Sequence, residues 1–582
     1  MKERRFRARV WSAALALSLA VPLVALDATP AEACGGFFCS QVPIDQSGEQ
    51  IVFAVKEGHV TAHIQISFAG EAEDFAWVVP VASKPEISVG TQSLFTQLRS
   101  ATEPQWYLNW DYQDQCGFWW GFAEDAAPSA GAGDGGNGVT VLETKEVGPY
   151  NTVTLESKDA KALIDWLNAN GFDQPAESLP LIEHYLAQNM LFVALKLSQN
   201  AGVGDIQPVV LDFKESQPCV PLILTRIAAV ADMPVRIWVL GEARAIPTNW
   251  FHVEINQKKI DWINGGSNYN DVVTAAVNEA AGHGFVTEFA GSTESWTTLV
   301  YNEGQYNLAA LKAAKSPADF VMQLLQQGFP RDSQMQGLLR KHIPMPSSLA
   351  AQGVTEQQFY NCLECYAEAL AGFAFDPEAF VADLVEKIIE PQKAAQAMLS
   401  AFPKITRLYT TVSPDEMNRD PLFDFNSELP DVSNVHQASA KAICGEDDKP
   451  QAVIITLEGG ETFELQGPFD NWWGQPMAGG EGEPAADSIT LMSTSGAGRV
   501  VPRETVEYYD QQLDTREVPK VIEELETEPD NGGKGNPATT GPKGVVTSGS
   551  GSGSSGCGAS GGAAGIGGLL LVGLAALRRR IY

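Results

Sequence analysis

The chain has 582 residues and a formal net charge of −33, with 39 Lys and Arg against 72 Asp and Glu. Proteins that bind nucleic acid present a positively charged surface, and this acidic chain has no long basic run outside its two ends, which excludes DNA and RNA as ligands. Its length is sufficient for a large core that divides into two or three folded units.

The first 33 residues have the layout of a secretory signal peptide. Basic residues crowd positions 2–9, and an apolar stretch follows over 10–26. Ala31-Glu32-Ala33 is an A-x-A cleavage site, so we expect cleavage after Ala33 and export of the remaining chain. Acylation of Cys34 is the weaker alternative, because Ala31 and Glu32 fit a lipobox poorly.

Eight cysteines occur, and in an exported chain disulfide bonds are the expected state of most of them. One of the eight, Cys557, belongs to the C-terminal tail considered below. The other seven are candidate disulfide cysteines: Cys34, Cys39, Cys116, Cys219, Cys362, Cys365 and Cys444. Their pairing does not follow from the sequence, and an odd number leaves one of them free or modified.

Residues 34–300 are predicted to form a mixed α/β region. Strict alternation over 59–68 predicts a half-buried strand whose polar face carries His59, Thr61 and His63. Two histidines four residues apart on a strand are separated by about 13 Å, which is too far to share one metal ion.

Further elements of this region follow from apolar runs and turn residues. The predicted strands are 51–55, 75–81, 139–147, 151–155, 208–213, 220–227, 235–240 and 285–289. The predicted helices are 89–99, 157–169, 179–189 and 270–281. The near-continuous apolar runs among these strands predict a sheet that is covered on both faces.

An aromatic stretch at 106–122 has eight aromatic residues in seventeen and includes Cys116. Exposed aromatic rings stack well on sugars, but aromatic residues more often belong to cores, so a core or interface insert is favoured over a ligand platform.

Several segments resemble the exported family catalogued as domain of unknown function 2330. They read ACGGFFC at 33–39, DFAWVVPV at 74–81, ILTRIAAV at 223–230, PVRIWVLG at 234–241 and FVTEFAG at 285–291. The resemblance extends to about residue 430. It implies an exported protein and no particular activity, and we transfer no catalytic residue from it.

A helical region is predicted at 301–402. Helical periodicity covers 307–314, 317–327, 333–342, 356–371, 377–389 and 392–401. Cys362-Leu-Glu-Cys365 falls inside the helix expected at 356–371. A redox pair is typical of a helix N-terminus and a zinc knuckle needs a second close pair, so structural disulfides to two separate partners are favoured.

A small β-containing region is predicted at 403–514, with a strand at 405–412 and a hairpin of 453–457 with 462–465. The intervening segment 413–431 is acidic and is interpreted as a solvated loop rather than a calcium site, because its carboxylates have no regular ligand spacing. These carboxylates are Asp415, Glu416, Asp420, Asp424, Glu428 and Asp431.

Residues 515–556 are charged and then rich in Pro, Gly and Ser, which predicts a disordered tether. The tail at 557–582 continues with Cys557, a short apolar helix over 563–577 and a membrane stop of three arginines: Arg578, Arg579 and Arg580. This order of parts resembles the MYXO-CTERM sorting tail of myxobacterial surface proteins. The resemblance implies an intramembrane sorting protease as a partner and Cys557 as the site of sorting or lipidation.

Together these features predict an α+β protein: a mixed sheet domain with helices, a helical bundle segment, a tether and a short apolar C-terminal helix. Outside the tail, neither a G-x-S-x-G elbow nor a phosphate-binding loop occurs, so we assign no catalytic, cofactor or metal residue. We expect the export machinery to deliver a binding or structural module to the cell surface or outer membrane, where the tail anchors it.

The alternative function is a secreted hydrolase of a polysaccharide or protein. It requires a cleft that joins two convergent carboxylates to the aromatic side chains of Trp106, Trp110, Trp119 or Trp120, whereas a buried aromatic cluster counts against it.

Overall fold

A computed structural model describes residues 45–69, 76–111, 140–172, 174–175, 177–197, 206–215, 217–446, 450–466 and 477–513. All of these residues belong to one compact unit that spans 33–582. The expected signal peptide, Cys34, Cys39, Cys116, the tether and the tail with Cys557 lie outside the described residues. Within the described ranges, none of the helices combines the length and the apolar character that a membrane span requires.

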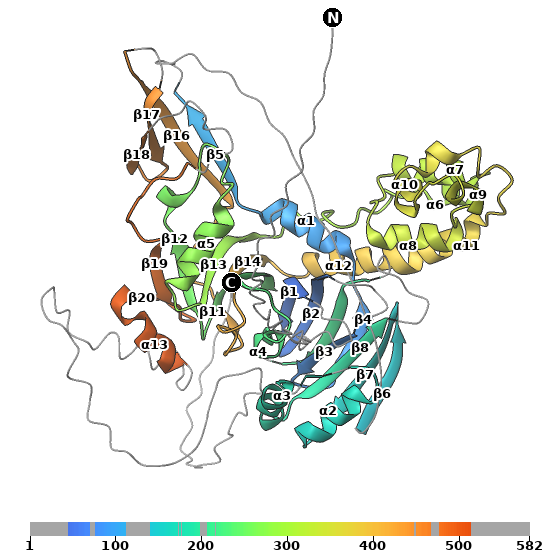
Figure 1. Cartoon of the computed structure of the whole chain (residues 1–582), viewed down its shortest axis with the longest axis horizontal. Helices are drawn as coiled ribbons and strands as arrows, with labels where there is room; N and C mark the ends of the chain where they lie inside the picture. Colours follow the sequence, from blue (N-terminus) through green and yellow to red (C-terminus); the bar gives the residue numbers. More distant parts are fainter. Residues whose placement is uncertain are drawn as a thin grey trace, which may run out of the picture. The chain divides into compact units, whose positions relative to one another are not determined.

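A ten-stranded mixed sheet organises the described chain (Figure 1). Its order is β20-β19-β12-β13-β14-β10-β1-β2-β9-β4, and only the pairs β1–β10 and β12–β13 are parallel. The strands are β1 (Asp45–Lys56), β2 (His59–Ala69), β4 (Glu86–Val89), β9 (Val209–Lys214), β10 (Met233–Gly241), β12 (Phe251–Ile255), β13 (Gly284–Ser292), β14 (Lys404–Val412), β19 (Ala486–Leu491) and β20 (Arg499–Val500). This sheet and the helices around it confirm the predicted α+β class.

A second, antiparallel sheet has the order β3-β8-β7-β6. It is accompanied by two helices whose apolar side chains join the same core, and Asp159 caps the first of them by accepting the Ala162 N–H. These elements are β3 (Ala76–Val81), β6 (Thr140–Val147), β7 (Tyr150–Glu156), β8 (Leu191–Leu197), α2 (Ala160–Asn168) and α3 (Ser178–Ala187). Strands β3, β6 and β7 were predicted from the sequence.

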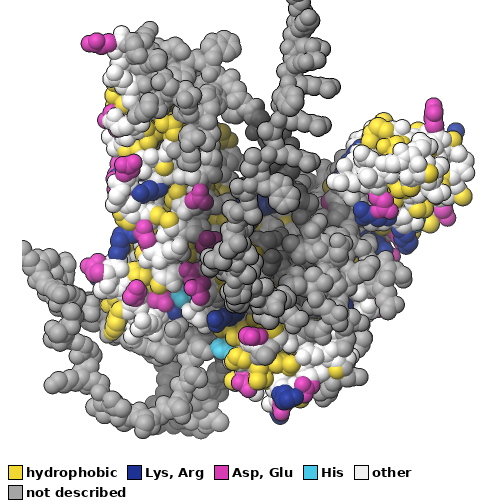
Figure 2. Space-filling view, viewed as in Figure 1, with side chains coloured by type: hydrophobic (Ala, Val, Ile, Leu, Met, Phe, Trp, Pro, Cys, Tyr) yellow, Lys and Arg dark blue, Asp and Glu magenta, His cyan; other side chains and the backbone are white. Residues whose placement is uncertain are grey.

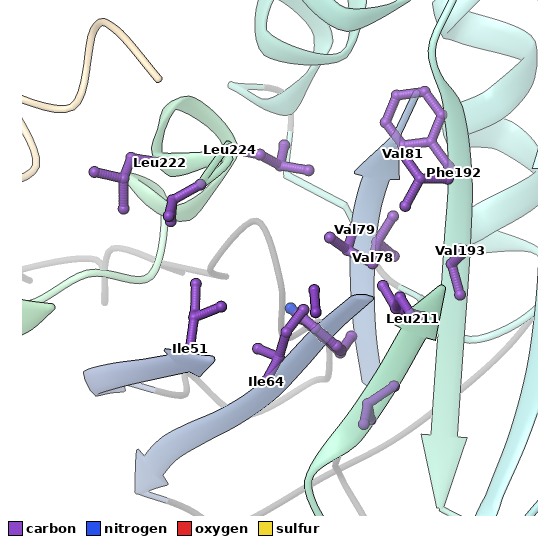
Figure 3. Packing of buried hydrophobic residues seen from close by; sticks show 14 of the residues in the cluster. Ile51, Ile64, Val78, Val79, Val81, Phe192, Val193, Leu211, Leu222 and Leu224 are labelled. Carbon is purple, nitrogen blue, oxygen red and sulfur yellow. The ribbon is translucent and has the colours of Figure 1, made fainter. Parts of the chain in front are cut away.

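The largest core cluster lies between these two sheets. Figure 3 shows side chains from β1, β2 and β9 of the large sheet meeting side chains from β3 and β8 of the second sheet. Successive residues of a strand point to opposite faces. Ile51 therefore belongs to this cluster, whereas its neighbour Val52 packs on the other face with Trp238 and the helices α1 (Gln92–Thr102) and α12 (Glu390–Ser400).

A third sheet has the order β18-β17-β16-β5 and packs its apolar face on a loop and a helix of the central region. Its β17–β18 hairpin turns at Gly460, whose φ of +82° favours glycine. The elements are β5 (Gln105–Trp110), β16 (Val435–Cys444), β17 (Pro450–Leu457), β18 (Thr462–Gln466), the 3₁₀ turn η4 (Gln257–Lys259) and α5 (Tyr269–Asn278). A two-stranded ribbon pairs β11 (Arg244–Pro247) with β15 (Phe423–Asn426).

The helical region is inserted between two strands that are hydrogen-bonded to each other, β13 and β14. It encloses its own hydrophobic cluster, so its packing is largely independent of the sheets. Before α12 it contains α6 (Leu308–Lys312), α7 (Pro317–Gln326), α8 (Ser333–His342), α9 (Ser347–Ala350), α10 (Glu356–Asn361), the 3₁₀ turn η5 (Leu363–Tyr366), α11 (Pro377–Leu384) and the π-helical turn η6 (Val385–Ile389).

The predictions for 220–227 and 413–431 are wrong. The apolar run 220–227 is not a strand but contains the short helix α4 (Leu222–Thr225), because the Ile223 N–H is bound by the carboxylate of Asp420 at 2.9 Å. The same contact overturns the interpretation of 413–431 as a wholly solvated loop. Asp420 has no exposed surface, and its Oδ1 also accepts the Tyr185 hydroxyl at 3.1 Å.

The cysteine prediction is confirmed in part. Cys219, Cys362, Cys365 and Cys444 are all disulfide-bonded. The preference for separate partners of Cys362 and Cys365 is wrong, because these two residues bond to each other. The predicted helix 356–371 ends at Asn361, so the pair occupies a turn after α10 rather than a helix interior. A four-residue loop gives a chain-entropy stabilisation of about 2 kcal/mol, less than a longer loop would.

Ionisation of the buried carboxyl group of Glu49 is unfavourable in the folded protein. Glu49 on β1 is 2% exposed, and its Oε2 has no hydrogen-bond partner. Burial raises the pKa of Glu49 to about 8, so the folded protein favours the neutral acid. Because the folded pKa lies above the usual value of 4.5, ionisation reduces stability progressively as the pH rises from 4.5 towards 8.

We therefore expect Glu49→Gln to stabilise the protein at alkaline pH, by roughly 4 kcal/mol at pH 9, and to have little effect at pH 4. Urea unfolding at both values measures the difference. The control is Glu183→Gln, at an exposed position of α3, which should leave stability unchanged at either pH. An equal effect of Glu49→Gln at pH 4 and pH 9 would contradict the assignment.

The last described helix, α13 (Val506–Leu513), follows the 3₁₀ turn η7 (Arg503–Thr505) and is attached by a buried ionic cluster. Asp510 Oδ1 lies 2.9 Å from His283 Nδ1 and 3.0 Å from the Arg419 guanidinium. Burial alone raises the pKa of Asp510, but its bonds to His283 and Arg419 outweigh this and lower the pKa below its ordinary value. The resulting stabilisation is present above pH 3.8 and is lost as the pH falls below it.

Asp510→Ala should cost about 3–5 kcal/mol at pH 7, because it removes the carboxylate that forms the buried ion pair with Arg419. Thermal and urea unfolding measure the loss. Glu507→Ala, on the exposed side of the same helix, is the matched control and should change stability by less than about 0.5 kcal/mol. Equal effects of the two substitutions would show that the ionic cluster does not hold the helix.

Candidate functional site: a polar pocket between two sheet edges

A pocket of 790 Å³ lies where the β4 end of the large sheet approaches the β6 end of the second sheet. Strands β2, β4 and β9 contribute one group of lining residues, and β6 and β7 contribute the other. The charged lining residues carry both signs: Lys84, Glu86, Lys145 and Asp212. A site with this lining suits a polar ligand that has both hydrogen-bond donors and acceptors.

A row of polar side chains crosses three strands on the large-sheet side. Strand register places Thr61 beside Asp212 and Asp212 beside Glu86. The Thr61 hydroxyl donates to Asp212 Oδ2 at 2.7 Å, and His59 Nδ1 lies 3.3 Å from Asp212 Oδ1. Both oxygens of Asp212 are thus engaged, whereas within the described ranges the Glu86 carboxylate forms no hydrogen bond or ion pair. Glu86 is the carboxylate available to a ligand.

Two strand edges face each other across the pocket. β4 is the last strand of the large sheet and β6 is the last strand of the second sheet. The Lys145 Nζ of β6 donates to the Ile87 carbonyl of β4 at 3.4 Å, so this carbonyl points away from β9 and towards β6. The N–H and C=O of one residue in an antiparallel strand point to the same side, so the Ile87 N–H is also directed into the gap.

The second-sheet side of the pocket is formed by two threonines of β7. Thr152 and Thr154 are each only 2% exposed, and the Thr152 hydroxyl donates to the Lys145 carbonyl at 2.9 Å. One end of the gap is closed where Gly148 meets Val89, since a Cβ at Gly148 would lie 2.6 Å from Val89 Cγ1. With a φ of +56° as well, Gly148 is the residue that allows the two edges to meet there.

The residues singled out from the sequence lie elsewhere. The bridge between Cys362 and Cys365 is in the helical region, and Cys219 and Cys444 follow β9 and end β16. Ala33 and the tail residues Cys557 and Arg578 to Arg580 lie outside the described residues. Among the described cysteines, the structure brings Cys362 and Cys365 together, and neither of them lines the pocket.

Trp106, the first residue of the aromatic stretch, packs in a buried aromatic cluster. Trp106 is 8% exposed, stacks on His436 at 4.1 Å and meets Trp262 edge-on at 5.0 Å. This confirms the core interpretation for the first residue of the stretch.

His63 is buried on β2, and burial lowers its pKa to about 4, so it is neutral at pH 7. Across the described ranges, no three His, Cys, Asp or Glu side chains are arranged to hold a metal ion.

Local sequence analysis did not identify the pocket as a site, because its residues come from five strands that are distant in the chain. Two signals point towards it. The polar face of 59–63 contributes Thr61, and the strand predicted at 151–155 carries Thr152 and Thr154 in alternation with apolar residues. Alternating polar residues mark one face of a strand, and such a face lines a pocket where another element lies opposite it.

Charge is mixed rather than segregated on one face of the described region. On the face shown in Figure 2, acidic side chains and Lys and Arg side chains are interspersed between apolar ones. Such a surface supports solubility and does not define a charged binding face of its own.

Comparison with known protein families gives a match. The model of a family described as uncharacterized protein conserved in bacteria, DUF2330, matches residues 28–337. No curated protein and no solved structure matches the chain. The matched range contains every residue that lines the pocket.

Proposed function

We propose that this chain, which belongs to the uncharacterized bacterial family DUF2330, is an exported binding protein anchored at the cell surface. Its ligand is an extended peptide segment that lies in the pocket between β4 and β6. The single observation that carries this proposal is the pocket itself, bounded by two strand edges and lined by hydroxyl and charged groups.

Strand edges recognise extended peptides through main-chain hydrogen bonds. The Ile87 N–H and C=O on β4 supply one donor and one acceptor towards the gap. Lys145 supplies a cation that already binds a main-chain carbonyl, so a ligand carbonyl is an equivalent partner for it. Glu86 carries the opposite charge and therefore suits a ligand amine or a basic side chain.

Export and anchoring are supported by the two ends of the sequence. Residues 1–33 end in an A-x-A site at Ala33, which directs cleavage and export. The tail from Cys557 to the three arginines resembles a MYXO-CTERM sorting tail, in which the cysteine is the point of processing and lipid attachment. We propose that the sorted product remains at the cell surface or outer membrane through Cys557.

Hydrolysis of a polymer is the competing function, and the described aromatic residues do not support it. Trp106 is buried in a cluster with His436 and Trp262, and neither Trp106 nor Trp110 lines the pocket. Glu86 and Asp212 lie side by side there, but Asp212 is held by Thr61 and His59. This arrangement favours a binding site with one available carboxylate over a pair of catalytic carboxylates.

The pocket proposal predicts that charge reversal at Lys145 weakens peptide binding. A random heptapeptide library displayed on phage is selected against the purified protein, and the consensus peptide is titrated by fluorescence anisotropy. Lys145→Glu should lower its affinity at least tenfold, because the reversed charge repels ligand carbonyls and acidic groups. The matched control is Lys161→Glu, since Lys161 is exposed on α2 and pairs only with its neighbour Asp165 at 2.6 Å.

Glu86→Lys extends the same experiment to the opposite charge. It should also lower the affinity at least tenfold and shift the library consensus from basic towards acidic residues. Absence of any enriched peptide, or equal affinities for Lys145→Glu and Lys161→Glu, would refute the pocket as the binding site.

The anchoring proposal predicts that Cys557→Ser releases the protein from the surface. Membrane fractionation and surface labelling of cells that express the full chain would show wild-type protein on the surface and the variant in the medium or the membrane interior. Cys444→Ser, which removes a disulfide cysteine of the folded region, is the control for general misfolding. Unchanged surface display of Cys557→Ser would contradict the sorting role of the tail.

A further inference from the structure

The disulfide of the helical region joins two cysteines three positions apart in the sequence and lies at the surface. Cys365 is exposed and Cys362 is half-buried, with a Cα–Cα separation of 5.3 Å. Cys362 lies between α10 and the 3₁₀ turn η5, and Cys365 lies within η5. A thiol in solution can therefore approach the Cys365 sulfur without any opening of the core.

The turn is held in place by contacts other than the disulfide. The Cys365 N–H donates to the Cys362 carbonyl at 3.0 Å. The Arg331 guanidinium bonds to the Asn361 carbonyl and, at 2.8 Å, to Glu364 Oε1. Leu363, between the two cysteines, is 1% exposed and fixed in the hydrophobic cluster of the helical region. Reduction would thus leave the two thiols facing each other in an unchanged turn.

Charged groups lie beside the pair in the chain. The Arg331 guanidinium bonds to the carbonyl of Asn361, which precedes Cys362, and to the carboxylate of Glu364, which lies between the two cysteines. The second carboxylate oxygen of Glu364, Oε2, is buried and has no hydrogen-bond partner. A guanidinium and a carboxylate thus accompany the two cysteines in this segment.

We propose that Cys362 and Cys365 form a thiol–disulfide exchange site that oxidises thiols of other molecules. A thiolate attacks the exposed Cys365 sulfur, the bond to Cys362 breaks, and Cys362 leaves with the electron pair and takes up a proton. A second substrate thiolate then attacks the mixed disulfide at the sulfur of the first substrate. The bond to Cys365 breaks, and Cys365 leaves with the electron pair and takes up a proton. Two thiols become one disulfide, and the disulfide of the protein becomes two thiols.

The role is independent of the peptide pocket, because the pair lies in another cluster of the fold and outside the residues that line the pocket. It also gives a reason for a bridge that adds little to stability, since chain-entropy stabilisation decreases as the closed loop becomes shorter.

The test is the rate of reduction of each disulfide in the folded, full-length protein by glutathione, followed by differential alkylation and mass spectrometry. Cys362 and Cys365 should become reduced at least 100-fold faster than the disulfides of Cys219 and Cys444, with an unchanged circular dichroism spectrum. Rates within threefold of one another, or reduction of Cys362 and Cys365 only as the protein unfolds, would overturn the proposal.

Two single variants test the order of attack. With oxidised glutathione, Cys362→Ser retains the exposed Cys365 and should form a mixed disulfide at least tenfold faster than Cys365→Ser, which retains the half-buried Cys362. Equal rates, or faster reaction of Cys365→Ser, would overturn the assignment of Cys365 as the attacked sulfur. Both variants should keep the backbone contacts of the turn. Circular dichroism checks that each variant is folded.

Discussion

The structure depends on the position of β10 between β1 and β14. β10 pairs in parallel with β1 and antiparallel with β14, so it joins the first described strand to a strand that follows the whole helical insertion. Its inner side chains Val235, Ile237 and Val239 have no exposed surface. These two pairings connect the two halves of the sheet. The half that borders the pocket continues from β1, and the half that borders α5 continues from β14. Such long-range pairing has a high loop-closure cost, so the core forms only when distant segments meet.

A buried ion pair fixes the register beside this centre. Glu288 is the extra residue of a bulge between Thr287 and Phe289 where β13 pairs with β14, and a bulge of this kind re-aims a side chain. The re-aimed carboxylate bonds to the guanidinium of Arg407 and accepts the Tyr269 hydroxyl at 2.7 Å. Removal of charges from water is costly, so a sheet shifted by one residue would leave both charges unpaired. The pair specifies the alignment more than it adds to stability.

Local pattern predicts most strands of this fold and fails where a distant residue decides the conformation. Alternation over 59–68 and apolar runs such as 235–240 are strand signals that the structure confirms as β2 and β10. The run 220–227 has the same apolar character, but Asp420, 197 residues from Ile223, accepts its N–H and favours a helical turn. No local pattern contains that partner. The pairing of Cys362 with Cys365 was likewise missed because a helix was expected to continue through them. The pocket was missed because five separated strands build it.

The functional account rests on the gap between β4 and β6 as a place for an extended chain. Hydrogen–deuterium exchange of the protein with and without its selected peptide tests this most directly. Binding should slow exchange in β4, at and around Ile87, and in β6, while the other end of the large sheet at β20 exchanges as before. Unchanged exchange in β4 and β6 with saturating peptide, or protection at β20 instead, would contradict the account.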